Sequence, residues 1–261
     1  MSNLSAVLWI ETRKVLRSKV PLVTALGFLI APLACAFLMF IYKNPDFARS
    51  MGLVSAKANL MGGSADWSFF LNMLAQAISV GGILLFNLVI SWVFGREFAD
   101  NVVKDLLAVP VARSTILLAK FIVAAIWSLS LALMVYLVGV TLGGWVGLNL
   151  WSQSAFVGGS LTVAVATLLV VAVSTPFALV ASVGRGYLLP VGISMLTMAV
   201  AQIIGLIGYG DYFPWTIPGL YANVAGPGNG ITSVSYWVVL FTCLAGMAAT
   251  YWWWMRADQN R

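Results

Sequence analysis

The sequence predicts an all-α, polytopic membrane protein with six transmembrane helices. Of its 261 residues, 61% are apolar and only 8% are charged, and the mean hydropathy is +0.97. A soluble protein carries about 25% charged residues, and one membrane span needs about 20 consecutive apolar residues. The loops left between the apolar runs are shorter than about 30 residues, which is too short for a catalytic domain with its own core. Residues 1–261 are therefore expected to form a single membrane domain.

Six apolar runs are each long enough to cross a bilayer. They are Val20 to Ile41, Phe69 to Phe94, Phe121 to Leu142, Phe156 to Val183, Tyr187 to Gly208 and Ser233 to Trp254. Proline occurs at Pro32, Pro176 and Pro190 within them, and each proline frees a backbone carbonyl and permits a kink.

Residues 1–19 precede the first run and have the pattern of an interfacial helix. Its apolar side chains, Leu4, Val7, Leu8, Val15 and Leu16, share one face, and Glu11, Arg13, Lys14 and Arg17 occupy polar positions. Such a helix lies in the plane of the membrane surface, where its basic end holds lipid phosphates.

The positions of the basic residues predict the orientation. Of the 14 Lys and Arg residues, all but Lys43, Arg49 and Lys57 fall on one side of the predicted spans. The positive-inside rule places that side, and both termini, in the cytoplasm. The net charge of +6 is explained by this topology and by attraction to anionic lipid, so no nucleic-acid partner is expected.

Polar side chains within the predicted spans are few, and none of them is ionisable. Ion-coupled transporters usually keep a charged residue inside the membrane, so transport here is expected to draw on an outside ATPase. The polar residues assigned to a substrate pathway are Asn87, Ser91, Thr141 and Gln202.

The segment 95–114 between the second and third runs predicts a short cytoplasmic amphipathic helix. Its apolar stripe contains Phe98, Val102, Val103, Leu106 and Leu107, and its opposite face contains Glu97, Asp100, Asn101, Lys104 and Asp105. Two interpretations remain open at this point, a helix resting on lipid headgroups and a docking helix for a protein partner. Anionic lipid would repel the acidic residues, which favours a protein partner of complementary charge.

The residues needed for several kinds of chemistry are missing. The sequence has no His, and its two cysteines, Cys35 and Cys243, lie apart within apolar runs, so neither a metal site nor a catalytic residue is predicted. No Gly is followed by Lys, so the phosphate loop of an ATPase is absent. The chain is expected to bind no cofactor.

Three short motifs follow one another along the chain. They are Glu11-x-x-Lys14-x-x-Arg17-Ser18, Gly95-Arg96-Glu97-Phe98, and Leu106-Leu107-x-x-Pro110-x-x-Arg113 followed by Leu117-Leu118-x-Lys120. With six spans and both termini inside, these motifs resemble the membrane subunits of ABC exporters of the ABC-2 type. The resemblance covers the whole chain in layout and is sharpest over residues 95–120.

The resemblance implies a partner and a location. It identifies the segment after the second span as a coupling helix, residues 97–109, that docks into a groove on a separate ATPase chain, which would bind the ATP and magnesium. It also implies a homodimer or a heterodimer with a second permease, embedded in the lipid bilayer of the bacterial cytoplasmic membrane. The residues assigned to ATPase docking are Glu97, Phe98, Asp100, Asn101, Lys104, Asp105, Leu106, Leu107 and Arg113.

The external connection at residues 209–232 is rich in aromatic residues and proline, including Pro214, Trp215 and Pro218. Such a segment can fold back into the outer leaflet, and the resembled family has a pair of short re-entrant helices here. The Pro-Trp-x-x-Pro pattern is similar to that of the permeases of bacitracin and lantibiotic export. An aromatic belt at the outer interface is the alternative for Trp215.

Three function classes follow from these patterns. The first is the membrane subunit of an ATP-driven exporter for a hydrophobic or amphipathic substrate, such as a peptide antibiotic, a lipid or a drug. The second is a non-enzymatic membrane scaffold or sensor. An intramembrane enzyme comes third, because Asp66 and Asp211 are the external acids available and neither has an evident catalytic partner.

Overall fold

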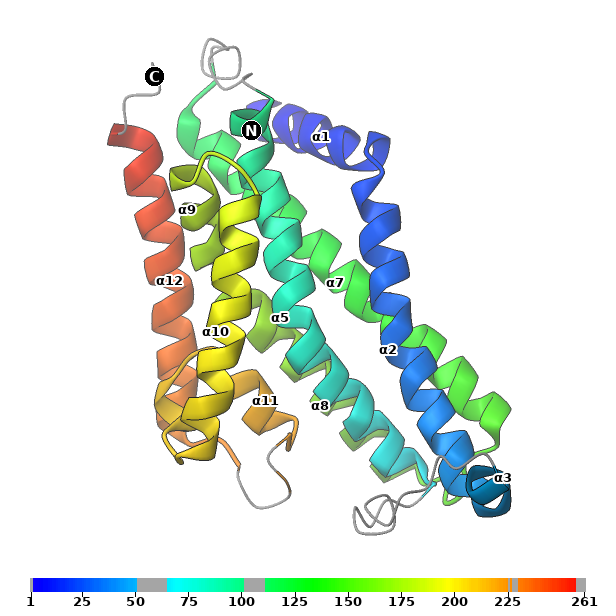
Figure 1. Ribbon diagram of the computed structural model, residues 1–261. Coiled ribbons are helices and arrows are strands. Elements are labelled where there is room, and N and C mark those ends of the chain that lie inside the picture. The colour runs from blue at the N-terminus through cyan, green and yellow to red at the C-terminus, as the bar shows by residue number, and fades with distance from the viewer. Residues whose placement is uncertain (1, 51–64, 101–110, 225, 227–229, 257–261) are drawn as a thin grey trace.

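A computed structural model describes residues 2–50, 65–100, 111–224, 226 and 230–256 of the chain (Figure 1). Over these residues the fold is all-helical, with one isolated bridge between Asp66 and Asn149. The helices are α1 (Ser2–Arg17), α2 (Val20–Lys43), α3 (Pro45–Ser50), α5 (Trp67–Ala99), α7 (Arg113–Val146), α8 (Gln153–Ser174), α9 (Pro176–Val183), α10 (Leu188–Leu206), η1 (Gly210–Tyr212), α11 (Ile217–Tyr221) and α12 (Ser233–Arg256).

Six of these segments are long and apolar enough to cross a membrane, which confirms the predicted multi-pass architecture. They are α2, α5, α7, α8 with α9, α10 and α12. Helix α1 lies across one end of the bundle, and α12 ends at that same end (Figure 1). We call this the basic end, because every described Lys and Arg residue except Lys43 and Arg49 lies there, and we call the opposite end the far end.

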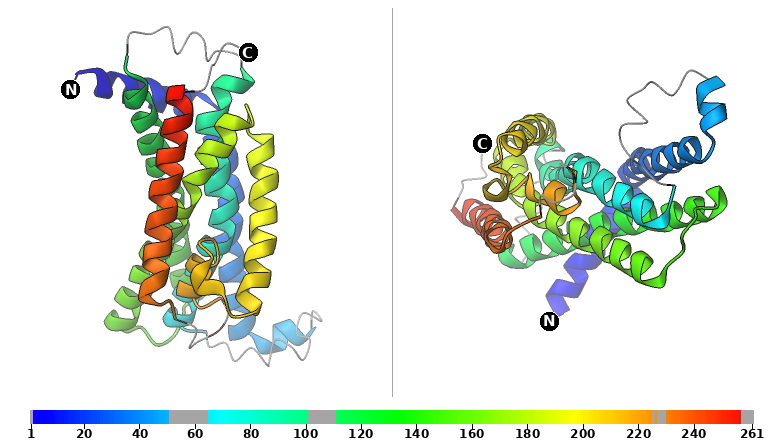
Figure 2. Two further views of the ribbon diagram at one scale, coloured as in Figure 1. Left: turned by 90° about the vertical axis from the view of Figure 1, so that its left-hand side faces the viewer. Right: turned by 90° about the horizontal axis from the view of Figure 1, so that it is seen from below.

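Helix α5 is the centre of the bundle. It contacts α2, α7, α8, α9 and α10, and its membrane-spanning part is the most buried of the six (Figures 1 and 2). Most of its buried side chains are apolar, including Phe70, Leu74 and Phe86. The other spans therefore cover α5 and turn their remaining apolar faces outward, as expected for a protein surrounded by lipid.

Two glycines of α7 allow that helix to approach α5 closely. A Cβ atom at Gly139 would lie 2.5 Å from Leu74, and one at Gly143 would lie 2.9 Å from Phe70. Small residues at such a crossing let two membrane helices pack closely. Helix α7 then ends at Gly147, whose φ of 70° is the left-handed conformation that glycine adopts readily.

Pro176 breaks the fourth span into α8 and α9. Without a proline N–H, the carbonyl of Ala172 accepts instead from the backbone N and the hydroxyl of Thr175, at 3.3 and 2.9 Å. Helix α12 passes close to the break, since a Cβ at Gly246 would lie 2.6 Å from the Pro176 nitrogen. Pro32 lies inside an unbroken α2, and Pro190 occupies the first turn of α10, where proline is tolerated.

The close contact at Gly246 predicts a large effect of a small substitution. Gly246→Ala should lower the stability of the purified protein by about 1–3 kcal/mol, because the methyl group meets backbone atoms of Pro176 that cannot move aside. Gly144→Ala is the matched control, since a Cβ there meets no atom within 4 Å. Thermal unfolding in detergent measures both variants, and equal melting temperatures would contradict the close approach.

Candidate functional site

Four ionisable side chains meet at the basic end, from three helices that are far apart in the sequence. Lys120 of α7 contacts Glu97 of α5 at 2.7 Å and Glu11 of α1 at 3.1 Å. Lys14 of α1 contacts the same two carboxylates, Glu97 at 3.0 Å and Glu11 at 2.6 Å. We call Glu11, Lys14, Glu97 and Lys120 the ion cluster.

The ion cluster is buried and balanced in charge. The exposed fraction is 0% for Lys120, 3% for Glu97 and 4% for Glu11. The third donor site of the Lys120 ammonium is satisfied by the carbonyl of Val93, at 2.8 Å. A buried ion pair stabilises little compared with an apolar replacement, but loss of one partner is costly because it leaves an unpaired charge.

Lys14 is the cluster member on the solvent side. Burial by itself would lower the pKa of Lys14, but attraction to Glu97 and Glu11, with a hydrogen bond to each, outweighs it and raises the pKa. Lys14 therefore remains charged throughout the physiological range and keeps the cluster neutral as a whole.

The pattern of α1 explains why it lies across the end of the bundle. Val7, Glu11 and Val15 are one or two turns apart and all are buried, and Val7 packs with Ile116 and Ala119 of α7. The inner face of this helix thus combines apolar contacts with the Glu11 carboxylate, and the outer face exposes Trp9 and Leu16. Residues 2–17 form the predicted amphipathic helix, but its inner side contacts protein.

The ion cluster corrects two expectations from the sequence. The spans do bury ionisable groups, because α5 extends to Ala99 and α7 begins at Arg113, so Glu97 and Lys120 belong to membrane-spanning helices. The expected place of Glu97 on the exposed polar face of the coupling segment is also wrong, because its carboxylate lies inside the protein against two lysines.

The other residues assigned to ATPase docking fall into three groups. Phe98 packs against the rings of Trp253 and Trp254, and Arg113 donates to the carbonyl of Trp254 at 3.0 Å, so both connect to α12. Asp100 is exposed and pairs with Arg96 at 3.2 Å. The remaining ones, Asn101, Lys104, Asp105, Leu106 and Leu107, lie outside the described residues.

The residues assigned to a substrate pathway do not form one path. Asn87 is buried and donates to Ser194 of α10 at 2.9 Å, and Ser91, one turn along α5, is also buried. Thr141 is exposed on α7 and donates to the carbonyl of its own helix at Val138. Gln202 of α10 lies two turns beyond Ser194, toward the far end.

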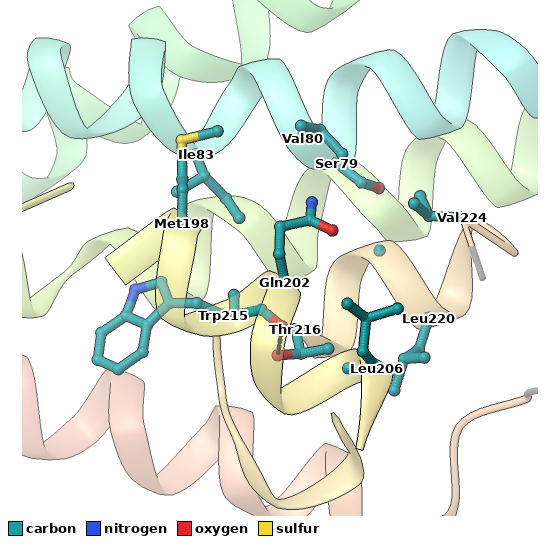
Figure 3. Close-up of a pocket in the computed structure, with 13 residues that line it drawn as sticks. Ser79, Val80, Ile83, Met198, Gln202, Leu206, Trp215, Thr216, Leu220 and Val224 are labelled. Atoms are coloured by element: carbon teal, nitrogen blue, oxygen red, sulfur yellow. Dashed lines mark hydrogen bonds between the residues drawn. The ribbon is translucent and has the colours of Figure 1, made fainter. Parts of the chain in front are cut away.

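Gln202 lines a pocket between α5, α10 and α11 near the far end (Figure 3). The cavity has a volume of about 180 Å³, and most of its lining is apolar, including Ile83, Met198 and Leu220. The side-chain amide of Gln202 extends into it and makes no hydrogen bond to any described residue. The pocket therefore offers an apolar surface with one free amide, a combination that suits an amphipathic ligand. We call it the far-end pocket.

The segment between α10 and α12 forms one wall of this pocket. The 3-10 helix η1 and helix α11 fold back against the spans, and Pro218 at the start of α11 accepts from the hydroxyl of Ser79 at 2.9 Å. Trp215 donates its indole N–H to the carbonyl of Val173 at 3.0 Å, next to the break between α8 and α9. Trp215 is half-buried among the helices. That the segment re-enters the membrane stays a prediction. Pro214 lies in the turn between η1 and α11.

Glu11, Lys14 and Lys120 occur in the motifs quoted from the sequence, but they were not assigned to a site there. One signal was available for Lys120, since it stands directly between apolar residues on both sides, Ala119 and Phe121. No group of three or more His, Cys, Asp or Glu residues that could hold a metal ion is found in the part of the chain that the structure describes.

Six packed spans, a largely buried charge cluster at one end and a small apolar pocket at the other define a multi-pass membrane protein. A family model described as "ABC-2 family transporter protein" matches residues 7–201, and the chain belongs to this family. It is therefore a membrane subunit of the ABC transporter class.

A curated relative agrees with the family. The chain is 23% identical to the "Bacitracin transport permease protein BCRB" of Bacillus licheniformis over 172 residues, which cover 65% of this chain and 81% of the relative. No solved structure matches the chain.

The ion cluster predicts a strong dependence on Lys120. Lys120→Met should destabilise the protein by about 3–5 kcal/mol, because Glu11 and Glu97 lose a buried partner. Asp100→Asn, which removes an exposed pair with Arg96, should cost about 0–1 kcal/mol. Melting temperatures of the purified variants measure the difference.

The double variant Lys120→Met/Glu97→Gln tests the cause. Glu11 then keeps Lys14 as its partner, so part of the lost stability should return. If the Lys120→Met and Asp100→Asn variants have equal melting temperatures, Lys120 is not needed to balance the buried charges of Glu11 and Glu97.

Proposed function

We propose that this chain is the membrane subunit of an ATP-driven exporter that moves a hydrophobic or amphipathic substrate, such as a peptide antibiotic, across the bacterial cytoplasmic membrane. The observation that carries the proposal is the family match over residues 7–201. The similarity to a bacitracin transport permease supports a peptide antibiotic as the substrate.

The far-end pocket supports this substrate class. Apolar side chains from α5, α10 and α11 would hold hydrophobic parts of the substrate, and the free amide of Gln202 would bind a peptide group. The pocket is small, so it would take one side chain or one short apolar part of a larger molecule.

ATP hydrolysis would occur on a separate cytoplasmic ATPase, which would bind ATP and magnesium. The sequence itself has no phosphate loop. The segment 101–110 would dock into that ATPase at the basic end, through its own residues Asn101, Lys104, Asp105, Leu106 and Leu107 together with Asp100. A dimer of two permeases, identical or not, would complete the transporter.

The ion cluster would transmit a displacement of the docking segment to the spans. Residue 101 follows the end of α5 and residue 110 precedes α7, and the Glu97–Lys120 pair joins these two helix ends. Phe98 and Arg113 connect the same ends to α12. A displacement of the docking segment would therefore move α1, α5, α7 and α12 together at the basic end.

The partner is tested by co-purification. The tagged chain, expressed together with an ABC ATPase encoded by a neighbouring reading frame, should retain that ATPase through purification. Bacitracin should stimulate its ATP hydrolysis in proteoliposomes. A chain that binds no such ATPase would instead fit a scaffold or sensor, and the exporter proposal would fail.

Charge reversal in the docking segment should weaken that complex. Asp105→Lys places a cation where a basic groove on the ATPase is expected, so ATPase recovery should fall severalfold. The same reversal at Asp46, in α3 at the far end, is the control and should leave recovery unchanged. Equal recovery with both variants would remove segment 101–110 from the docking surface.

Substrate handling should depend on Gln202. Gln202→Leu removes the free amide of the far-end pocket without breaking a hydrogen bond, so stability should change little. The bacitracin resistance of cells that express the transporter should fall by about tenfold or less, the size expected when one hydrogen bond to a substrate is lost. Thr141→Val, at an exposed site outside the pocket, is the matched control. Equal resistance in both variants at equal membrane abundance would contradict a substrate role for the pocket.

A further inference from the structure

Two further cavities lie in line along the outer side of α7. The first, of about 330 Å³, is bounded by α7 from Leu118 to Ser128, by α8 and by α12 at Cys243 and Met247. The second, of about 370 Å³, is bounded by α7 from Leu129 to Tyr136 and by α8. Leu168 of α8 lines both, so the two cavities are neighbours along α7. We call them together the α7–α8 groove.

The length of the groove matches the bilayer. At about 1.5 Å per residue, the part of α7 from Leu118 to Tyr136 extends about 27 Å, close to the hydrocarbon thickness of about 30 Å. The first cavity accounts for about 15 Å of this length, which is the depth of one leaflet. It begins at the basic end, five residues after Arg113.

The lining of the groove suits hydrocarbon. Its floor is formed by buried apolar side chains such as Phe86, Ile90 and Val163, and Leu118 and Leu168 on its walls are exposed toward the membrane. The buried hydroxyls of Thr167 and Ser174 donate to carbonyls of their own helix, at 2.8 Å each. A cavity with so few free polar groups does not hold ordered water.

The charge at the basic end of the groove is positive. Arg113 joins α7 to α12 there through the carbonyl of Trp254, and no acidic residue occurs in the first turn of α7. The acids described at this end are engaged elsewhere, Glu11 and Glu97 in the ion cluster and Asp100 with Arg96. The guanidinium of Arg113 is therefore available to an anion at the level of the headgroups.

We propose that the α7–α8 groove binds an acyl chain of an anionic phospholipid from the leaflet at the basic end, with the lipid phosphate at Arg113. The chain lies along the first cavity, against Thr175 and Cys243 at the break between α8 and α9. It keeps α7 apart from α12 below the Arg113 contact. This site is separate from the far-end pocket, which lies between α5, α10 and α11.

The experiment places the full chain in nanodiscs that contain mostly zwitterionic lipid and a small fraction of an anionic phospholipid with a diazirine in the middle of one acyl chain. After illumination, mass spectrometry should find the label on residues 118–128 and 168–175. Excess unlabelled anionic phospholipid should reduce this labelling, and inorganic phosphate should not.

Two variants of α7 separate the groove from the ordinary lipid-facing surface. Ala125→Trp fills the first cavity and should lower the labelling at least fivefold. Ile126→Trp, at the next residue, adds the same side chain on an exposed face that does not line the groove, and labelling should persist. Arg113→Gln should lower the preference for the anionic probe over a zwitterionic one severalfold.

Three outcomes would overturn the proposal. Equal labelling of the Ala125→Trp and Ile126→Trp variants would show that the groove is not the binding site. In the unmodified protein, equal labelling of every lipid-facing helix, with no reduction by unlabelled lipid, would also show that the groove is not a specific site. Absence of label together with disulfide-linked dimers of an Ala125→Cys variant would show that a second copy of the chain covers the groove.

Discussion

The burial of Lys120 constrains the whole basic end of the protein. An ammonium group in this position needs carboxylates close by, and the two that contact it come from α1 and α5. The requirement fixes α1 across the end of the bundle and joins the end of α5 to the start of α7. The connection between α5 and α7 contains the proposed docking segment. Both of its ends are therefore attached to helices that the ion cluster joins to each other.

In the middle of the membrane domain, hydrogen bonds rather than ion pairs stabilise the break at Pro176. A helix interrupted within the bilayer must have its freed carbonyls satisfied by protein, because lipid offers no donor. Thr175 satisfies Ala172, and Trp215 from the segment between α10 and α12 donates to Val173. That segment is thus held against the break, and it also forms a wall of the far-end pocket. The same segment therefore contacts both the far-end pocket and the broken span.

The apolar pattern was sufficient to predict the six spans, and their ends differ from the observed helices by up to eight residues. The ion cluster could not be predicted in this way, because Glu11 and Lys120 are separated by 109 residues and Lys14 and Glu97 by 83. Periodicity indicates which face of a helix is apolar, but it does not say which distant charges meet. The apolar neighbours of Lys120 indicate that it is buried, but they do not identify the two carboxylates that pair with it.

The two ends of the bundle differ in how strongly their helices are joined. At the basic end, largely buried charged pairs hold three helices, and separating them would leave unpaired buried charges. Helix α10 is joined to α5 by a hydrogen bond between Asn87 and Ser194 and, nearer the far end, through α11 by the contact of Ser79 with Pro218. Each such bond contributes only about 1 kcal/mol. Helix α10 also has the smallest buried share of the six spans, 17% against 61% for α5. A rearrangement driven from the basic end would therefore separate α10 from α5 before it broke the ion cluster, and this is the side on which the far-end pocket lies.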